Sequence, residues 1–280
     1  MKGENEKMKK RIMSLALMMM FTLCGALFCV PTVGAVVNAQ AASVMYQERS
    51  GTPIGRASER IYYSDSVIDT FIPTPNRMPV YGAVNCGATA GINTIAWYNR
   101  ELSNLIPGHA AGRYIGSSWV WTGQNQTILD LFAVIDTFMG GGGSNGVTIN
   151  GYLTGIISYA NARGYGIAIS DTRAGNNSLK SSFKTSIRAG GLVALFLDTF
   201  NVTASMGVEH FNGYDLISLT QFSGCHVMVA YGYKEVTYLD EYGNVFRQDM
   251  YARVQTGYEN GWIRINDFCT LDAAWLTHIY

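Results

Sequence analysis

A cysteine at the start of a predicted helix is the residue in this sequence best suited to nucleophilic chemistry. Cys86 follows Asn85, a common helix N-cap, and apolar residues recur at 88, 92, 95 and 96, the spacing of one helical face. The positive end of a helix dipole favours the thiolate, which is the nucleophilic form of cysteine. The alternative is a small cysteine buried in an ordinary amphipathic helix, so a catalytic role needs a histidine elsewhere.

The chain has four histidines, and one of them begins a predicted strand. His226 opens the apolar run 226–233, which is typical of a buried strand. His210 lies in a polar loop and is the second candidate base. His109 follows a Pro-Gly pair and His278 lies near the end of the sequence, so we expect both at the surface.

The segments around Cys86 and His226 together resemble the papain-like cysteine peptidases, especially their bacterial exported, leader-peptidase-like branches. Residues 85–90 match the nucleophile segment, and residues 224–233 match the histidine segment. A third similarity, to the closing strand and tail of streptopain-like members, covers residues 261–266 and 271–274. The resemblance covers roughly residues 73–280. It implies an α+β, papain-like fold, in which a helical first half carries the nucleophile and packs on an antiparallel, barrel-like sheet that carries the histidine.

The resemblance also implies a mechanism and a third residue. Cys86 would attack a carbonyl carbon as thiolate, and His226 would hold the thiolate as an ion pair and then protonate the departing amine. The backbone N–H of Cys86 would meet the developing oxyanion. The residue that orients the histidine matches Gln255, with Asn260 and Asp267 as competitors.

Two positions depart from the family pattern, and one of them is Gln255, where the family normally has Asn or Asp. Papain-like enzymes usually carry a glutamine six residues before the nucleophile as oxyanion donor, and this sequence has Val80 there. Tyr81, Asn76 and Asn85 are the alternative donors, and the sequence does not choose among them.

The N-terminal region has the layout of a secretory signal peptide. A basic opening precedes the uncharged, largely apolar run 12–37, and 39–41 has the small-x-small form of a cleavage site, so we assign 1–41 to the signal. An uncleaved membrane anchor is the competing interpretation. We expect a secreted or cell-surface protein without stable membrane insertion, with 42–72 a leader, linker or propeptide and 73–280 the peptidase domain.

The charge of the chain and its cysteine content limit which binding partners and which disulfides we expect. Removing residues 1–41 takes away five basic and two acidic side chains, which leaves 15 basic against 18 acidic residues and a net charge of −3. Without a basic patch, nucleic acid is not an expected partner. Three cysteines remain, and pairing of Cys225 with Cys269 would leave Cys86 as the free thiol. The scattered histidines and the absence of a zinc-binding spacing indicate no metal and no cofactor.

The remaining pattern predicts helices first and strands second. We expect the Cys86 helix to end near Leu105 and its small residues, including Gly87 and Gly91, to let it press closely on a neighbour. An aromatic loop is expected at 109–125 and a flexible connector at 140–146. The other predicted elements are helices at 127–139, 149–163 and 179–187, strands at 165–170, 192–197, 226–233, 245–253, 251–255 and 262–266, and a short helix or turn at 271–276.

The predicted function is that of an exported thiol hydrolase, a cysteine-type peptidase that cleaves peptide or isopeptide bonds of peptide or protein substrates. Two alternatives remain open. The sequence has Val80 where the family has glutamine, and Gln255 where the family has Asn or Asp. Both departures favour a binding or structural module whose catalytic site has degraded. A thiol acyltransferase or cell-wall amidase would use the same Cys86–His226 dyad.

Overall fold

The computed structural model describes residues 52–62, 65–82, 85–141, 146–175, 177–203, 209–211, 214–265 and 269–280. All of these belong to the unit formed by Ala39–Tyr280. The predicted signal segment therefore lies outside the described residues. No helix in the described part combines the length and apolarity that crossing a membrane requires.

Four helices are described, and three of them begin at a polar cap. The side chains of Asn85, Asn125 and Thr148 each accept a hydrogen bond from the backbone N–H three residues on, which satisfies a donor that the helix itself cannot. The predictions of helix starts near these residues are confirmed. The helices are α3 (Cys86–Asn99), α4 (Gln126–Phe138), α5 (Ile149–Ala162) and α6 (Ser182–Arg188).

Helix α3 is shorter than predicted. It ends at Asn99 rather than near Leu105, because the Asn99 side chain ties down the chain that follows. Its Oδ1 accepts from the backbone N–H of Ile106 at 2.7 Å, and its Nδ2 donates to the backbone oxygen of His109 at 2.9 Å. These bonds stabilise a turn in place of further helix.

The expected close approach of α3 to its neighbours is confirmed. A Cβ at Gly87 would lie 2.7 Å from Cβ of Val147, and one at Gly91 would lie 2.4 Å from Cε of Met139. Such distances leave no room for a side chain. The two glycines therefore allow α3 to pack against residues at both ends of the connection between α4 and α5.

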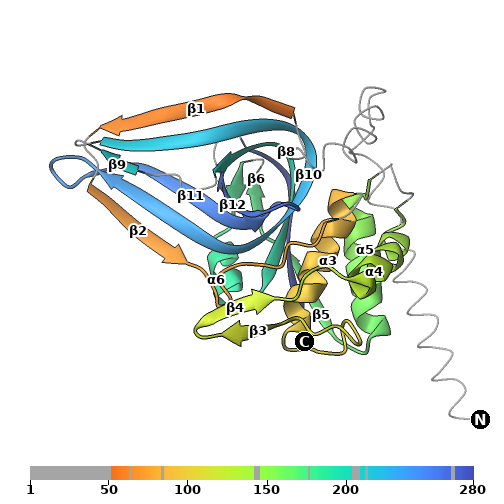
Figure 1. Ribbon diagram of the computed structural model, residues 1–280. Coiled ribbons are helices and arrows are strands. Elements are labelled where there is room, and N and C mark those ends of the chain that lie inside the picture. The colour runs from red at the N-terminus through yellow and green to blue at the C-terminus, as the bar shows by residue number, and fades with distance from the viewer. Residues whose placement is uncertain are drawn as a thin grey trace, which may run out of the picture. The chain divides into compact units, whose positions relative to one another are not determined.

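The strands form one large antiparallel sheet and two small hairpins. Pairings of β10 with β11, β11 with β12, β12 with β8 and β8 with β10 close four strands into a ring, visible in Figure 1. The large sheet consists of β1 (Thr52–Tyr62), β2 (Asp65–Phe71), β5 (Ile167–Asp171), β8 (Leu192–Thr203), β9 (Glu209–Phe211), β10 (Tyr214–Leu239), β11 (Val245–Gln255), β12 (Asn260–Ile265) and β13 (Thr270–Ile279). The fold is α+β with an antiparallel sheet, as predicted.

Two segments differ from their predicted structure. The expected helix or turn at 271–276 is wrong: it lies within β13, which pairs with β8 on one side and β5 on the other. Its Leu and Ala residues favour helix locally, but two neighbouring strands satisfy its backbone. The loop predicted at 109–125 contains the hairpin β3 (Gly112–Ile115) and β4 (Ser118–Trp121). The remaining small hairpin joins β6 (Arg173–Gly175) and β7 (Ser178–Leu179).

Part of the predicted leader is integrated in the sheet. Strand β1 runs antiparallel to β10, from Thr52 opposite Ser223 to Tyr62 opposite Tyr214, and β2 pairs with the far end of β10. Residues 42–51 lie outside the described part of the chain, as do 142–145 of the glycine-rich connector. Whether 42–72 acts as a leader or propeptide stays a prediction.

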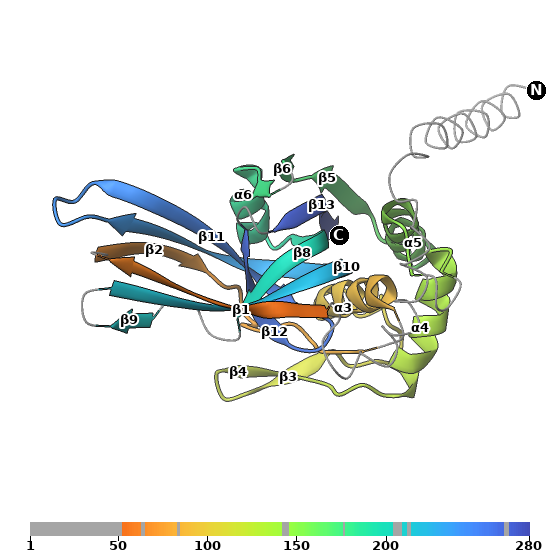
Figure 2. The ribbon, with the colours of Figure 1, turned by 90° about the horizontal axis from the view of Figure 1, so that it is seen from above.

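The two faces of β10 pack into different cores. Helices α3, α4 and α5 gather on one side of the sheet in both views, and Val227, Val229 and Tyr231 of β10 contribute to the core beneath them (Figures 1 and 2). Met228 and Ala230 belong to the second core, which side chains of β8, β11 and β12 fill. This alternation along β10 decides which side chains can meet at the site.

Candidate functional site

Cys86 occupies the first position of α3, as predicted. Asn85 has extended backbone angles, and its Oδ1 accepts a 2.6 Å hydrogen bond from the backbone N–H of Ala88. The amide Nδ2 of Asn85 donates to Asp136 of α4, also at 2.6 Å. The cap thus fixes both the start of the helix and its attachment to α4. The sequence offered no signal for the contribution of Asp136.

The sulfur of Cys86 lies against the strand that carries His226. Burial raises the pKa of the Cys86 thiol, and the backbone N–H groups of Val227, Cys86 and Gly87 lower it in part by hydrogen bonding to the sulfur. Val227 directly follows His226 in β10. The tertiary structure therefore brings the two sequence motifs together at the backbone of Val227.

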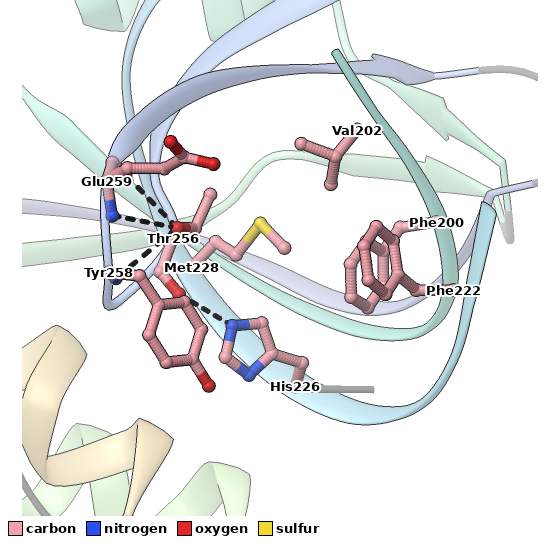
Figure 3. A pocket seen from close by; sticks show the side chains of 8 residues that line it. All are labelled: Phe200, Val202, Phe222, His226, Met228, Thr256, Tyr258 and Glu259. Carbon is pink, nitrogen blue, oxygen red and sulfur yellow. Dashed lines mark hydrogen bonds between the residues drawn. The ribbon is translucent and has the colours of Figure 1, made fainter. Parts of the chain in front are cut away.

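The ring of His226 is buried and held by a backbone carbonyl. Only 2% of the residue is exposed, and Nε2 lies 2.8 Å from the backbone oxygen of Thr256. A carbonyl oxygen only accepts, so Nε2 carries the hydrogen and the neutral ring has its lone pair on Nδ1. Figure 3 shows that second nitrogen turned away from Thr256. Aromatic rings stack near it, with centroids at 5.8 Å for Phe200 and 6.4 Å for Tyr258.

Burial sets the charge states of both groups. Desolvation lowers the pKa of His226 to about 4, opposed in part by the hydrogen bond with Thr256. The pKa of Cys86 is raised, again by burial. At neutral pH the pair is therefore a thiol and a neutral imidazole, whereas the family resemblance implies a thiolate–imidazolium pair.

The side chains of Cys86 and His226 belong to two different packing clusters. Cys86 packs on the core that contains Val227 and Val229, whereas His226 and Met228 line a hollow on the other face of β10. The clusters meet at the strand backbone, where the N–H of Val227 contacts the sulfur. A reaction between the two side chains requires the imidazole to turn toward Cys86.

Gln255 lies on the same sheet face as Cys86. It is opposite Val229 in the register of β10 and β11, its residue is 1% exposed, and its Oε1 accepts from the backbone N–H of Gly257 at 3.0 Å. Its Nε2 is buried and has no hydrogen-bond partner among the described residues. The group that holds His226 is instead the backbone oxygen of the next residue, Thr256. A backbone carbonyl leaves no trace in residue types, which is why sequence reasoning missed it.

The two competitors for the orienting role are placed differently. Asn260 exchanges two hydrogen bonds with Met78: its Oδ1 accepts from the backbone N–H at 2.9 Å and its Nδ2 donates to the backbone oxygen at 3.1 Å. Asp267 lies outside the described residues. The catalytic roles of Cys86, His226 and Gln255 stay predictions.

None of the predicted oxyanion side chains is an evident donor. Asn76 is exposed, and Asn85 is the helix cap. The hydroxyl of Tyr81 donates to the backbone oxygen of Thr122 at 2.7 Å. The backbone N–H groups at the start of α3, which already contact the sulfur, are the donors that the described residues offer.

The other histidines have structural surroundings. His109 is 4% exposed, so its expected surface position is wrong. The hydroxyl of Tyr81 lies 3.1 Å from its Nε2 and the amide of Asn125 lies 3.4 Å from its Nδ1, which ties the ring into the loop before α4. His278 is half-buried with its ring against Tyr98. The side chain of His210, in β9, lies outside the described set.

No disulfide joins the two cysteines that we considered a pair. The Cys225 thiol donates to Oδ1 of Asp198 at 3.1 Å and is exposed, whereas Cys269 is a free thiol buried in the core inside the ring of strands. Within the described residues, no group of three or more His, Cys, Asp or Glu side chains is arranged to hold a metal ion.

Comparison with known proteins adds no assignment. Searches of protein-family models, of curated proteins and of solved structures found no match to this chain. The site must therefore be interpreted from its own geometry.

Proposed function

We propose that this protein is an exported, papain-like thiol hydrolase that cleaves peptide or isopeptide bonds with Cys86 as nucleophile and His226 as base. The observation that carries the proposal is the contact between the Cys86 sulfur, at the N-terminus of α3, and the backbone of Val227, the neighbour of His226. Two motifs that lie far apart in sequence meet at one point. A merely structural cysteine does not need this juxtaposition.

The protonation states favour general-base catalysis. His226 holds its Nε2 proton on Thr256, so Nδ1 can take the proton of the Cys86 thiol as the sulfur attacks the carbonyl carbon. The same proton then passes to the leaving amine as the C–N bond breaks, which leaves a thioester on Cys86. Water hydrolyses this acyl-enzyme and restores the thiol. Backbone N–H groups of the first turn of α3 would stabilise the oxyanion.

The reaction requires His226 to leave its resting position. Because the side chains of residues 226 and 227 point to opposite faces of β10, the backbone at residue 226 must also change when substrate binds, so that the imidazole reaches the face that holds Cys86. Catalytic contacts in substrate-free structures are often longer than in the reacting complex.

The test is to trap the acyl-enzyme. The purified protein is incubated with a mixture of peptides and a peptide ester, quenched in acid and analysed by mass spectrometry. We expect mass spectrometry to find an acyl group on the peptide that contains Cys86. Product formation should disappear in Cys86→Ala and in His226→Ala. Activity should be unchanged in Cys225→Ser, whose thiol is exposed on β10, the strand that carries His226. Activity that persists in Cys86→Ala refutes the proposal. Adding a primary amine separates hydrolysis from acyl transfer by its products.

The pH dependence is a second test of the same mechanism. A general base must be neutral, so kcat/KM should fall as the pH drops through the His226 pKa of about 4 and should be level from about pH 5.5 to pH 7. An acid limb near 6.5 would contradict a neutral, buried base.

One observation favours a binding or structural module instead. Cys86 and His226 are both neutral and belong to separate cores, which is also the arrangement of a site that no longer reacts. In that case the Cys86→Ala protein would retain the full biological activity of the unmodified protein.

A further inference from the structure

Helix α4 ends beside the start of α3, the helix that begins with Cys86. The contact is made by Asp136, in the last turn of α4, whose Oδ1 accepts a 2.6 Å hydrogen bond from Nδ2 of Asn85. Asn85 directly precedes Cys86, and its own Oδ1 accepts from the backbone N–H of Ala88 at 2.6 Å. The oxygen of this one amide therefore holds the first turn of α3, and its nitrogen is held by α4.

A glycine turn ends α4 directly after Asp136. Gly140 has a φ of 66°, a left-handed conformation that glycine adopts without strain, and its N–H donates to the backbone oxygen of Thr137 at 3.0 Å. The N–H of Gly141 reaches back to the backbone oxygen of Asp136 at 2.8 Å. These two bonds form a Schellman motif, which satisfies carbonyl groups that the helix leaves open. The glycines that begin the run at 140–146 thus give α4 a defined end.

Gly141 also leaves room for the side chain of Asp136. A Cβ at Gly141 would lie 3.1 Å from Oδ2 of Asp136 and closer still to Oδ1, the atom that accepts from Asn85. Gly141 is not among the glycines with a left-handed φ, so glycine is needed there for space rather than for backbone freedom. The carboxylate of Asp136 is therefore packed against the turn and bonded to the cap of α3.

Met139 fixes this end of α4 against both neighbouring helices. Its residue is 3% exposed, and a Cβ at Gly91 of α3 or at Gly155 of α5 would collide with its side chain. The three helices gather together in both ribbon views (Figures 1 and 2). Because protein interiors are close-packed, the end of α4 cannot shift without disturbing α3 and α5. Asp136, one turn before Met139, is thus held beside Asn85.

We propose that Asp136 is a positioning residue for Cys86 and acts through Asn85. The inference rests on the proposed function, in which Cys86 is the nucleophile. With its amide held by Asp136, Asn85 keeps the first turn of α3 helical, and the backbone N–H groups of Cys86 and Gly87 stay directed at the sulfur. Hydrogen bonds to the sulfur favour the negative charge that develops on it as the thiol gives up its proton. Without Asp136 the amide can rotate, and the first turn frays.

The test compares the reactivity of the Cys86 thiol in variants of Asp136. All proteins carry Cys225→Ser, which removes the exposed thiol, and alkylation of Cys86 by iodoacetamide is followed by mass spectrometry from about pH 6 to about pH 10. In Asp136→Ala the profile should move to higher pH, and the rate at about pH 8 should fall about 5-fold, the factor that a typical helix cap contributes. Asp136→Asn keeps an oxygen acceptor for Asn85 and should retain most of the rate. Equally slow alkylation in Asp136→Asn and Asp136→Ala would refute the role of hydrogen-bond acceptor.

Two further variants separate positioning from general stability. Asp130→Ala, on the exposed side of α4 where Asp130 accepts from Gln126, should leave the alkylation profile unchanged. Gly141→Ala keeps Asp136 but displaces its carboxylate from Asn85, so it should slow alkylation as Asp136→Ala does. Circular dichroism and thermal unfolding establish that each variant folds. A folded Asp136→Ala protein with an unchanged profile overturns the proposal, because Asp136 would then contribute to stability alone.

Peptide cleavage provides the second measurement. In Asp136→Ala kcat should fall while KM stays the same, because Asp136 acts on the nucleophile and not on the substrate. A shifted alkylation profile combined with no cleavage by the unmodified protein supports the positioning role and refutes the proposed function. Cleavage by the unmodified protein, with equal kcat and equal alkylation in Asp136→Ala, refutes the positioning role and leaves the proposed function standing.

Discussion

Replacing His226 with glutamine should remove a pH-dependent loss of stability. His226 is buried, and its pKa falls from 6.5 to about 4 in the folded protein, chiefly through desolvation. Between these values the unfolded chain binds a proton that the folded protein does not. The free energy of unfolding therefore falls as the pH drops from about 6.5 to about 4, and this contribution levels off below the folded pKa.

The magnitude follows from the size of the shift. A shift of about 2.5 pH units at 1.36 kcal/mol per unit gives about 3 kcal/mol between pH 7 and pH 3.5. Because the residue is 2% exposed, solvent screening reduces this figure little. Glutamine does not titrate and keeps an N–H donor for Thr256, so the variant should lack this part of the pH dependence.

The assay is urea unfolding at half-unit steps from pH 3.5 to pH 7.5. Other titrating groups, including the buried His109, contribute to both proteins and cancel in the difference between them. His278→Gln, which changes a half-buried histidine against Tyr98, is the matched control. Parallel curves for the unmodified protein and His226→Gln would refute a buried, neutral His226, and with it the neutral dyad.

Two further predictions concern the packing that positions Cys86. Asn85→Ala removes the α3 cap and should lower the free energy of unfolding by about 1–2 kcal/mol in urea titrations, whereas Asn76→Ala, at an exposed position, should change it by less than about 0.5 kcal/mol. Gly155→Ala would place a Cβ 2.4 Å from Cγ of Met139 and 3.0 Å from the Met139 backbone. The resulting overpacking should cost about 1–3 kcal/mol. This cost outweighs the gain in helix propensity, so the variant should have a lower Tm. Gly123→Ala meets nothing within 4 Å and is its control; equal Tm values for the two variants would contradict the close packing.

The features predicted well from sequence depend on neighbouring residues. The starts of α3, α4 and α5 followed from apolar periodicity, and Asn85 caps α3 as expected. The misses depend on distant residues. Asn99 ends α3 through bonds to a later loop, and two flanking strands make 271–276 a strand.

The sequence by itself determined which chemistry is available: a thiol at a helix N-terminus, a histidine on a buried strand and a set of small residues that let α3 pack closely. Helix capping and periodicity act over a few residues, so they can be read along the chain. Only the tertiary structure decided that His226 is buried and neutral, that the backbone of Thr256 rather than the side chain of Gln255 holds it, and that Val227 contacts Cys86. Desolvation and strand register depend on which distant segments pack together, and residue types alone do not specify either.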